Sequence, residues 1–300
     1  MRYDAIIIGG SFAGLSAAMY LARARKTVCV LDTGKPRNRF TAQAHGVFGW
    51  DGAEPKDMLR TMRQQVAYYS TVSFLKEEAV ELLANVDGYS VALRSGAVVS
   101  GKRILFSFGI SDVMPPKPGV AERWGNSVLH CPYCHGYEFR DQRLGVLNVS
   151  PISFHQAMLI ADWGPTTFYL DGGELSPSDS DDLRRRGVEI ESEAVDHLSG
   201  PGSGLSEIHL SGGRISPIDA LFISPKHRLN SAVAAQSGCA IDSSPLGPIV
   251  KVDEMQMTNV PRLFAAGDIT RVGHSVTFAC ADGVKAAMAM HRSLVFGTAA

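Results

Sequence analysis

The sequence predicts an α/β protein with two dinucleotide-binding, Rossmann-like domains of three layers each, the second inserted into the first. Two observations carry this prediction. Strand, turn, helix and strand patterns follow one another near the N-terminus and again in mid-chain, and an apolar strand with an alanine-rich helix returns at the end. With 300 residues, 45% of them hydrophobic, the chain is long enough for two cores. We expect one domain at 1–115 and 226–300, and the inserted domain at 116–225.

The N-terminal unit has the order of a dinucleotide-binding βαβ element. YDAIII is an apolar strand, GGSFAG a glycine turn, an apolar helical stretch follows, and KTVCVLD is a second strand that closes on Asp32. Gly9 makes the tight turn, the helix start presents N–H groups to a pyrophosphate, and Asp32 can bind a ribose. Ser11 replaces the second glycine of the pattern, and its hydroxyl can bond phosphate. Because Asp32 lies 18 residues after Gly14, the unit predicts dinucleotide binding.

Composition excludes several classes of protein. A net charge of −1 and a pI near 6.8 give no global basic field, so we expect no nucleic-acid partner. No apolar run approaches the roughly 20 residues that span a bilayer, so we expect no membrane partner. The N-terminus runs straight into an apolar strand without the features of a secretory signal, which favours a cytoplasmic protein.

The segment HCPYCHGYE, from His130 to Glu138, fits four kinds of chemistry: c-type haem attachment, a glutaredoxin-like dithiol, a zinc site, or a redox disulfide facing a flavin. Covalent haem requires export, for which the chain shows no signal. Zinc normally takes four ligands from paired clusters, whereas Cys29, Cys239 and Cys280 stand alone in apolar surroundings. We therefore predict no metal site.

Three motifs together carry a resemblance to a known family. GGSFAG, CPYCHG and FAAGD occur in the order and at about the spacing of the low-molecular-weight thioredoxin reductase group of FAD-dependent pyridine nucleotide-disulfide oxidoreductases. The chain resembles that group over essentially its full length. The resemblance implies FAD as cofactor, an FAD domain made of the first and last segments, a CxxC that opens the inserted domain, and a homodimer. A glutaredoxin-like module would instead place CPYC after the first strand of a domain of about 100 residues.

The resemblance also implies roles for individual residues. The glycine turn would hold the FAD pyrophosphate, Asp32 the adenosine ribose and Asp268 the ribityl chain. Gly109 would belong to a turn that runs past the cofactor, although SFG in this chain replaces the family's ATG. The implied FAD-binding residues are Gly9, Ser11, Gly14, Asp32, Gly109, Gly267 and Asp268.

The implied catalytic residues are Cys131, Cys134 and His135. By position, Cys134 would lie against the flavin and Cys131 would exchange with the partner thiol or disulfide, because a thiolate is the attacking species. His135 stands where the family typically has an aspartate that gives a proton to the thiolate. Imidazole, with an ordinary pKa near 6.5, can give or take a proton at cellular pH. A structural histidine is the alternative, and the role of His130 stays open.

The second nucleotide unit lacks the features of an NADPH site. Asn148, Ser150 and Ser153 stand where the family has its second glycine turn, and Pro151 removes an N–H from that loop. No Lys or Arg occurs from 144 to 183, although a 2′-phosphate needs such partners. Asp171 could suit the ribose of NADH, but without the glycines that route is also poor. We expect that NADPH does not reduce this protein at a useful rate.

Two functional hypotheses remain. The first is a dithiol oxidase that resembles the gliotoxin- and holomycin-type branch with CxxCH, oxidises a small dithiol and passes electrons to oxygen. The second is a thioredoxin reductase-like enzyme that serves a thioredoxin-type protein from ferredoxin or another donor. His135 and the altered loop favour the first. A flavin-binding protein without catalysis is disfavoured by the intact CxxC.

Overall fold

A computed structural model describes residues 2–297, which divide into two compact units. The first unit consists of three segments: one that ends at Arg37, Lys56–Ser111, and one that begins at Arg228. The second unit contains Asn38–Pro55 and Asp112–His227. Asn38–Pro55 lies inside the expected 1–115 domain, but in the structure it groups with the second unit. The assignment of the first unit to FAD and of the second to thiol chemistry stays a prediction.

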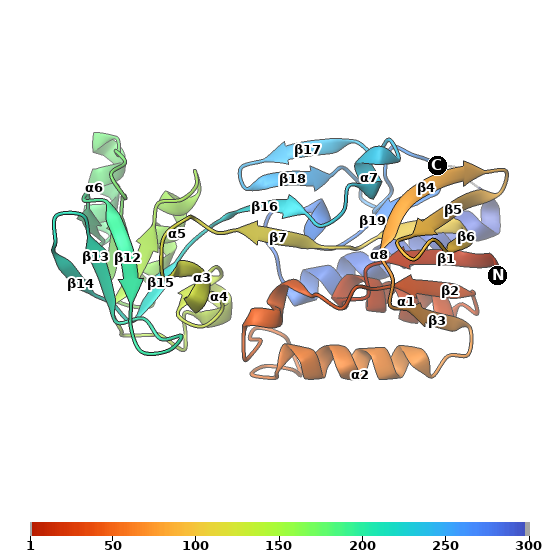
Figure 1. Ribbon diagram of the computed structural model, residues 1–300, viewed down its shortest axis with the longest axis horizontal. Helices are drawn as coiled ribbons and strands as arrows, with labels where there is room; N and C mark the ends of the chain where they lie inside the picture. The colour runs from red at the N-terminus through yellow and green to blue at the C-terminus, as the bar shows by residue number, and fades with distance from the viewer. Residues whose placement is uncertain (1, 298–300) are drawn as a thin grey trace. The chain divides into compact units, whose positions relative to one another are not determined.

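The first unit is built on one mixed sheet in the order β3-β2-β1-β6-β5-β4, with β19 also paired to β6 (Figure 1). Pairing is parallel among β3, β2, β1, β6 and β19, and antiparallel along β4, β5 and β6. Every residue of β2 is buried, as expected of a parallel strand covered on both faces. The strands are β1 (Arg2–Ile8), β2 (Val28–Leu31), β3 (Val72–Leu75), β4 (Ala79–Asn85), β5 (Gly88–Leu93), β6 (Val98–Phe106) and β19 (Leu263–Ala265).

Helices and a hairpin complete the first unit. The helix after the glycine turn and the C-terminal helix cross closely, because a Cβ at Gly283 would overlap the carbonyl oxygen of Ala13. These elements are α1 (Phe12–Arg23), α2 (Pro55–Ala67), α7 (Val233–Gln236), the 3-10 turn η2 (Asp268–Thr270), α8 (Val276–Phe296) and the hairpin strands β17 (Ile241–Ser244) and β18 (Gly247–Val250).

The second unit has a parallel sheet in the order β11-β10-β9-β15-β8 and a smaller antiparallel sheet, β12-β13-β14. Its strands are β8 (Val128–Leu129), β9 (Leu144–Leu147), β10 (Thr166–Tyr169), β11 (Glu189–Glu191), β12 (Val195–Ser199), β13 (Glu207–Leu210), β14 (Ile215–Pro217) and β15 (Ala220–Phe222). Its helices are α3 (Val120–Arg123), α4 (Pro132–His135), α5 (Ser153–Ile160) and α6 (Pro177–Arg185), and the 3-10 turn η1 (Arg37–Phe40) begins its first segment.

Alternating residues of the parallel sheet form two separate cores in this unit. Leu147, Tyr169 and Leu221 belong to the core shared with the antiparallel sheet. Their neighbours Val146 and Phe168 belong to the core shared with α5 and α6. Since strand side chains point to opposite faces in turn, the sheet is the middle of three layers.

The chain passes between the units along β7 (Ile110–Val113) and β16 (Lys226–Leu229), which pair with each other. The two parallel sheets, one in a segment that interrupts the other, confirm the predicted α/β class. None of the helices in the described part of the chain combines the length and hydropathy that a membrane span requires.

We predict that Gly283→Ala destabilises the first unit. The added methyl would overlap the Ala13 carbonyl and force α1 and α8 apart, which typically costs about 1–3 kcal/mol. The midpoint of urea unfolding, followed by circular dichroism, measures the effect. Met288→Ala is the control, because Met288 is 56% exposed on the same helix. Equal midpoints for the two variants would contradict the close crossing.

Candidate functional site

The glycine turn after β1 lies against the loops that follow β2 and β6. The Gly9 N–H donates to the Leu31 carbonyl at 2.8 Å, and the Ser107 hydroxyl donates to the Gly9 carbonyl at 2.9 Å. Gly9 has a φ of +114°, and a Cβ there would overlap the Ser107 carbonyl. A Cβ at Gly10 would come within 2.8 Å of the Asp32 Cβ. Only glycine fits at either position, so backbone atoms rather than side chains form this part of the loop cluster.

The start of α1 leaves backbone N–H groups open for an anion. Ser11 is the N-cap, and its hydroxyl makes no capping bond. The first backbone bond of the helix runs from the Leu15 N–H to the Ser11 carbonyl, so the N–H groups before Leu15 lie outside the helical ladder. A Cβ at Gly14 would overlap the Gly9 carbonyl. This arrangement fits the pyrophosphate of FAD.

Two further predicted residues lie at the same sheet edge, after β19. Gly267 has a φ of +82°, and a Cβ there would lie 3.0 Å from the Ala13 Cβ, so this loop contacts α1. Asp268 begins η2, and Arg37 Nη1 lies 3.3 Å from Asp268 Oδ2. Gly109, with a φ of +71°, follows β6. Together, these residues fit the cofactor that the resemblance implies, and FAD held there would supply an acceptor for two electrons. Sequence reasoning missed Ser107, Gly10 and Arg37.

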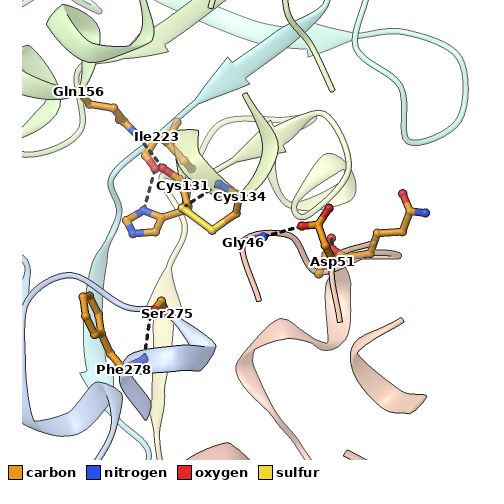
Figure 2. Close-up of a disulfide and its surroundings, with 11 residues drawn as sticks. Gly46, Asp51, Cys131, Cys134, Gln156, Ile223, Ser275 and Phe278 are labelled. Carbon is orange, nitrogen blue, oxygen red and sulfur yellow. Dashed lines mark hydrogen bonds between the residues drawn. A yellow bond between two sulfur atoms is a disulfide. The ribbon is translucent and has the colours of Figure 1, made fainter. Parts of the chain in front are cut away.

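Cys131 and Cys134 form a disulfide in the second unit, with their Cα atoms 5.3 Å apart. Pro132 opens the single helical turn α4 between them, and the Cys134 N–H donates to Cys131 Sγ at 3.2 Å (Figure 2). We call Cys131–His135 the CxxC turn. A Cβ at Gly136 would come within 2.9 Å of the Trp163 indole, so this glycine lets the turn pack closely against that ring.

The residue before the disulfide is fixed from two sides. Gln156, from α5, donates through Nε2 to the His130 carbonyl at 2.7 Å. His130 Nδ1 lies 3.2 Å from the Ile223 carbonyl, at the end of β15 (Figure 2). His130 therefore ties the CxxC turn to the parallel sheet.

The remaining cysteines do not take part in this site. Burial raises the pKa of the Cys29 thiol to about 11, and burial also raises the pKa values of Cys239 and Cys280. All three therefore stay as thiols at neutral pH, which suits core residues rather than nucleophiles. Among residues 2–297, no group of three or more His, Cys, Asp or Glu residues is placed to hold a metal ion.

His135 follows the disulfide directly, and its pKa is lowered. Burial is the largest cause, because it disfavours the imidazolium; His45 also lowers the pKa, while the carboxylate of Glu138 raises it. His45 Nε2 lies 3.6 Å from Glu138 Oε1. His135 is thus a neutral base at physiological pH. Sequence reasoning missed His45 and Glu138, since no motif marks them.

The altered turn after β9 is closed by its own side chain. Ser153, which is fully buried, accepts hydrogen bonds through Oγ from the N–H groups of Val149 and Ser150, each at 3.1 Å. The Ser153 N–H in turn donates to the Ser150 carbonyl at 3.0 Å. The N–H groups of Val149, Ser150 and Ser153 are therefore already bonded within this turn.

The carboxylate of Asp171, in the loop after β10, already has bonding partners. Asp171 Oδ1 lies 2.8 Å from Lys117 Nζ and accepts from the Val195 N–H at 2.8 Å. Lys117 Nζ also donates to the Val195 carbonyl at 2.7 Å. A ribose at this carboxylate would therefore have to compete with a cation and an N–H.

Comparisons with known proteins find similar sequences and structures over most of the chain. Residues 3–283 match the sequence model of the family described as pyridine nucleotide-disulphide oxidoreductase. An oxidoreductase from Agrobacterium tumefaciens has a similar structure, with a TM-score of 0.95 and 36% identity over 99% of this chain and 100% of its own. A thioredoxin reductase of Claviceps purpurea, tcpT, is 31% identical over 88% of this chain and 86% of its own length. Another, sirT of Leptosphaeria maculans, is 28% identical over 95% and 92%.

We predict that Asp268→Ala weakens FAD binding by about 10- to 100-fold, the loss expected when one hydrogen bond to a charged group, worth about 1.5–3 kcal/mol, is removed. The dissociation constant is measured by titrating FAD into apoprotein and following the quenching of its fluorescence. Asp87→Ala is the control, because Asp87 pairs with Arg2 at an exposed position away from this loop cluster. An equal change in both variants would argue against a role of Asp268 at the cofactor.

Proposed function

Because the chain belongs to the pyridine nucleotide-disulphide oxidoreductase family, whose thioredoxin reductase-like members are FAD-binding flavoproteins, we propose that this oxidoreductase is a dithiol oxidase. In this function a small dithiol is oxidised at the Cys131–Cys134 disulfide. Bound FAD would supply the acceptor for the electron pair, and oxygen would be the final acceptor. The flux thus runs from thiol to oxygen rather than from NADPH to a disulfide.

The closed turn at Ser153 carries this proposal. A pyridine nucleotide would have to break the two bonds to Ser153 Oγ before it could use the N–H groups of Val149 and Ser150. Each lost bond to a charged phosphate is worth about 1.5–3 kcal/mol, and a ribose would also have to compete with Lys117 for Asp171. Since reduction and oxidation of a nicotinamide use the same site, both NADPH as donor and NADP⁺ as acceptor are disfavoured.

The dithiol step then balances as two exchanges. The first substrate thiolate bonds to Cys131 Sγ, the Cys131–Cys134 bond breaks, and Cys134 leaves with the electron pair as a thiolate. The second substrate thiolate attacks the substrate sulfur of the mixed disulfide, which closes the substrate's S–S bond and releases Cys131. The substrate has lost two electrons and two protons, and the electron pair resides on the cysteines.

His135 is suited to take a thiol proton in this step. Its neutral imidazole follows Cys134 directly and has a lowered pKa, chiefly because partial burial disfavours the charged form. A thiol becomes a nucleophile only on losing its proton, and a general base beside the disulfide removes it where it is needed.

A second candidate function rests on the named relatives. The proteins tcpT and sirT are called thioredoxin reductases, so a thioredoxin-type protein is the alternative partner, with ferredoxin or another donor replacing NADPH. Tyr133 and Tyr137, which are 71% and 66% exposed, offer aromatic contact surface beside the disulfide to either partner. As in the family, we expect a homodimer.

We predict that millimolar NADPH or NADH gives no saturable reduction of the flavin within a minute without oxygen, whereas dithiothreitol bleaches it. The physical reason is the bonded turn at Ser153. Anaerobic stopped-flow absorbance measures bleaching, and an oxygen electrode then measures consumption when dithiothreitol and air are both present.

Cys134→Ser is the control, because it replaces one sulfur atom by oxygen and removes the disulfide. Bleaching by micromolar NADPH would make the protein an ordinary NADPH-dependent thioredoxin reductase. Bleaching by dithiothreitol without oxygen consumption would instead favour the thioredoxin-type partner.

We predict that His135→Ala lowers the rate of dithiol-dependent flavin reduction by about 10²-fold while FAD stays bound. In the parent, the rate should rise with pH through a pKa below 6.5 and then level off, because the base acts when neutral and its pKa is lowered. The single-turnover rate as a function of pH measures this limb. His155→Ala, an exposed change on α5, should leave both rate and limb unchanged. A parental rate in His135→Ala at every pH would make His135 a structural residue.

A further inference from the structure

A short loop of the second unit places a second imidazole near His135. We call Ala44–Ala53 the 44–53 loop. The Ala44 N–H donates to the Ala53 carbonyl at 2.9 Å, which closes the loop at its base. Within it, the Gly46 N–H donates to Asp51 Oδ1 at 2.8 Å (Figure 2). The side chain of His45 is 17% exposed and lies next to this bond.

His45 lies between two carboxylates, one from its own loop and one from the segment after the CxxC turn. Nδ1 is 3.6 Å from Asp51 Oδ1, and Nε2 is 3.6 Å from Glu138 Oε1. Glu138 follows His135 by three residues in the same run of turns, and its charge acts on His135. The Glu138 carboxylate therefore lies 3.6 Å from the His45 imidazole and acts electrostatically on His135. On its other side His45 faces Asp51, whose side chain is 70% exposed.

The chemistry of a dithiol requires more proton capacity than one histidine provides. Two thiols lose two protons for each disulfide that closes, and the cysteines of the CxxC turn take electrons rather than these protons when they leave as thiolates. His135 can hold one proton, and burial disfavours its charged form. A base that is still protonated cannot accept the proton of the second thiol, so His135 must lose the first proton between the two exchanges.

We propose that His45 is the second proton acceptor of this site and that Glu138 passes the proton to it from His135. This proposal deepens the dithiol oxidase function and rests on it. The proton taken from the first thiol moves from His135 to Glu138 and then to His45, and water at the exposed Asp51 end removes it. His135 is neutral again when the second thiol reacts.

The charges around His135 are consistent with this path. The groups that act on its titration are Glu138, from its own segment, and His45, from the 44–53 loop; Asp51 faces His45. The pKa of His135 is lowered by His45 and raised by Glu138, so removing either one shifts the titration in a known direction. His45→Gln should raise the pKa of His135, and Glu138→Gln should lower it.

The kinetic test uses the FAD-loaded protein and dithiothreitol without oxygen. We expect His45→Gln and Glu138→Gln each to slow the dithiol step by about 10-fold in dilute buffer near pH 7, and added imidazole to restore the rate, because a soluble base can replace a proton acceptor but not a structural contact. His197→Gln is the matched control: His197 also contacts a carboxylate, that of Asp196, but lies on β12. Loss of rate without rescue by imidazole, or no loss of rate, would overturn the proposal.

A second measurement keeps this proposal separate from the proposed function. Histidine labelled with ¹³C lets the titration of His135 be followed by NMR in the oxidised protein, with the His135→Ala variant assigning its signal. Shifts of opposite sign in His45→Gln and Glu138→Gln support the coupling, and an unchanged His135 pKa in both refutes it. If the parent fails to oxidise dithiothreitol, the proposed function fails, while the NMR titration still decides whether the two imidazoles are coupled.

Discussion

Burial of parallel strands on both faces is the constraint on which the candidate sites depend. Such strands have no free face for polar side chains, so functional residues gather in the loops at the carboxyl ends. In the first unit, Gly9, Asp32 and Ser107 each follow the last residue of a buried strand directly. In the second unit, His130 follows β8 and Asn148 follows β9 in the same way. The redox disulfide and the altered nucleotide turn therefore belong to one sheet edge.

The two units share this architecture, but their turns differ in one decisive way. At the start of α1, the Ser11 hydroxyl makes no capping bond, and the N–H groups stay outside the helical ladder. At the start of α5, the Ser153 hydroxyl accepts two of the N–H groups of its own turn. A buried polar group must be bonded, so a turn that bonds itself has no need of a phosphate. The Ser153 side chain thus closes the turn before α5, whereas Ser11 makes no such bond before α1, where we expect the FAD pyrophosphate to bind.

The sequence predicted what depends on local pattern and not what depends on distant pairs. The glycine turn, Asp32 and the CxxC could be recognised because strand period, turn residues and spacing lie within a short stretch. The ion pair of Arg37 with Asp268 joins residues 231 apart, and no local signal announces it. Lys117 was equally hidden: the 144–183 segment has no Lys or Arg, yet the fold brings this lysine to Asp171 from outside it. The position of the 44–53 loop was unforeseen for the same reason. Its glycines predict turns, but they do not predict that His45 lies near Glu138.

His135 stands where the family typically has an aspartate, and this difference bears on the direction of the reaction. Burial disfavours the charged form of either residue, but with opposite results: it raises the pKa of a carboxyl group and lowers that of an imidazole. A buried carboxyl group therefore tends to keep its proton and can give it to a thiolate, as a disulfide reductase requires. A buried imidazole tends to lose its proton and can take one from an incoming thiol, as a dithiol oxidase requires. The lowered pKa of His135 gives this site a base. In the proposed path, Glu138 and His45 then accept the proton from that base.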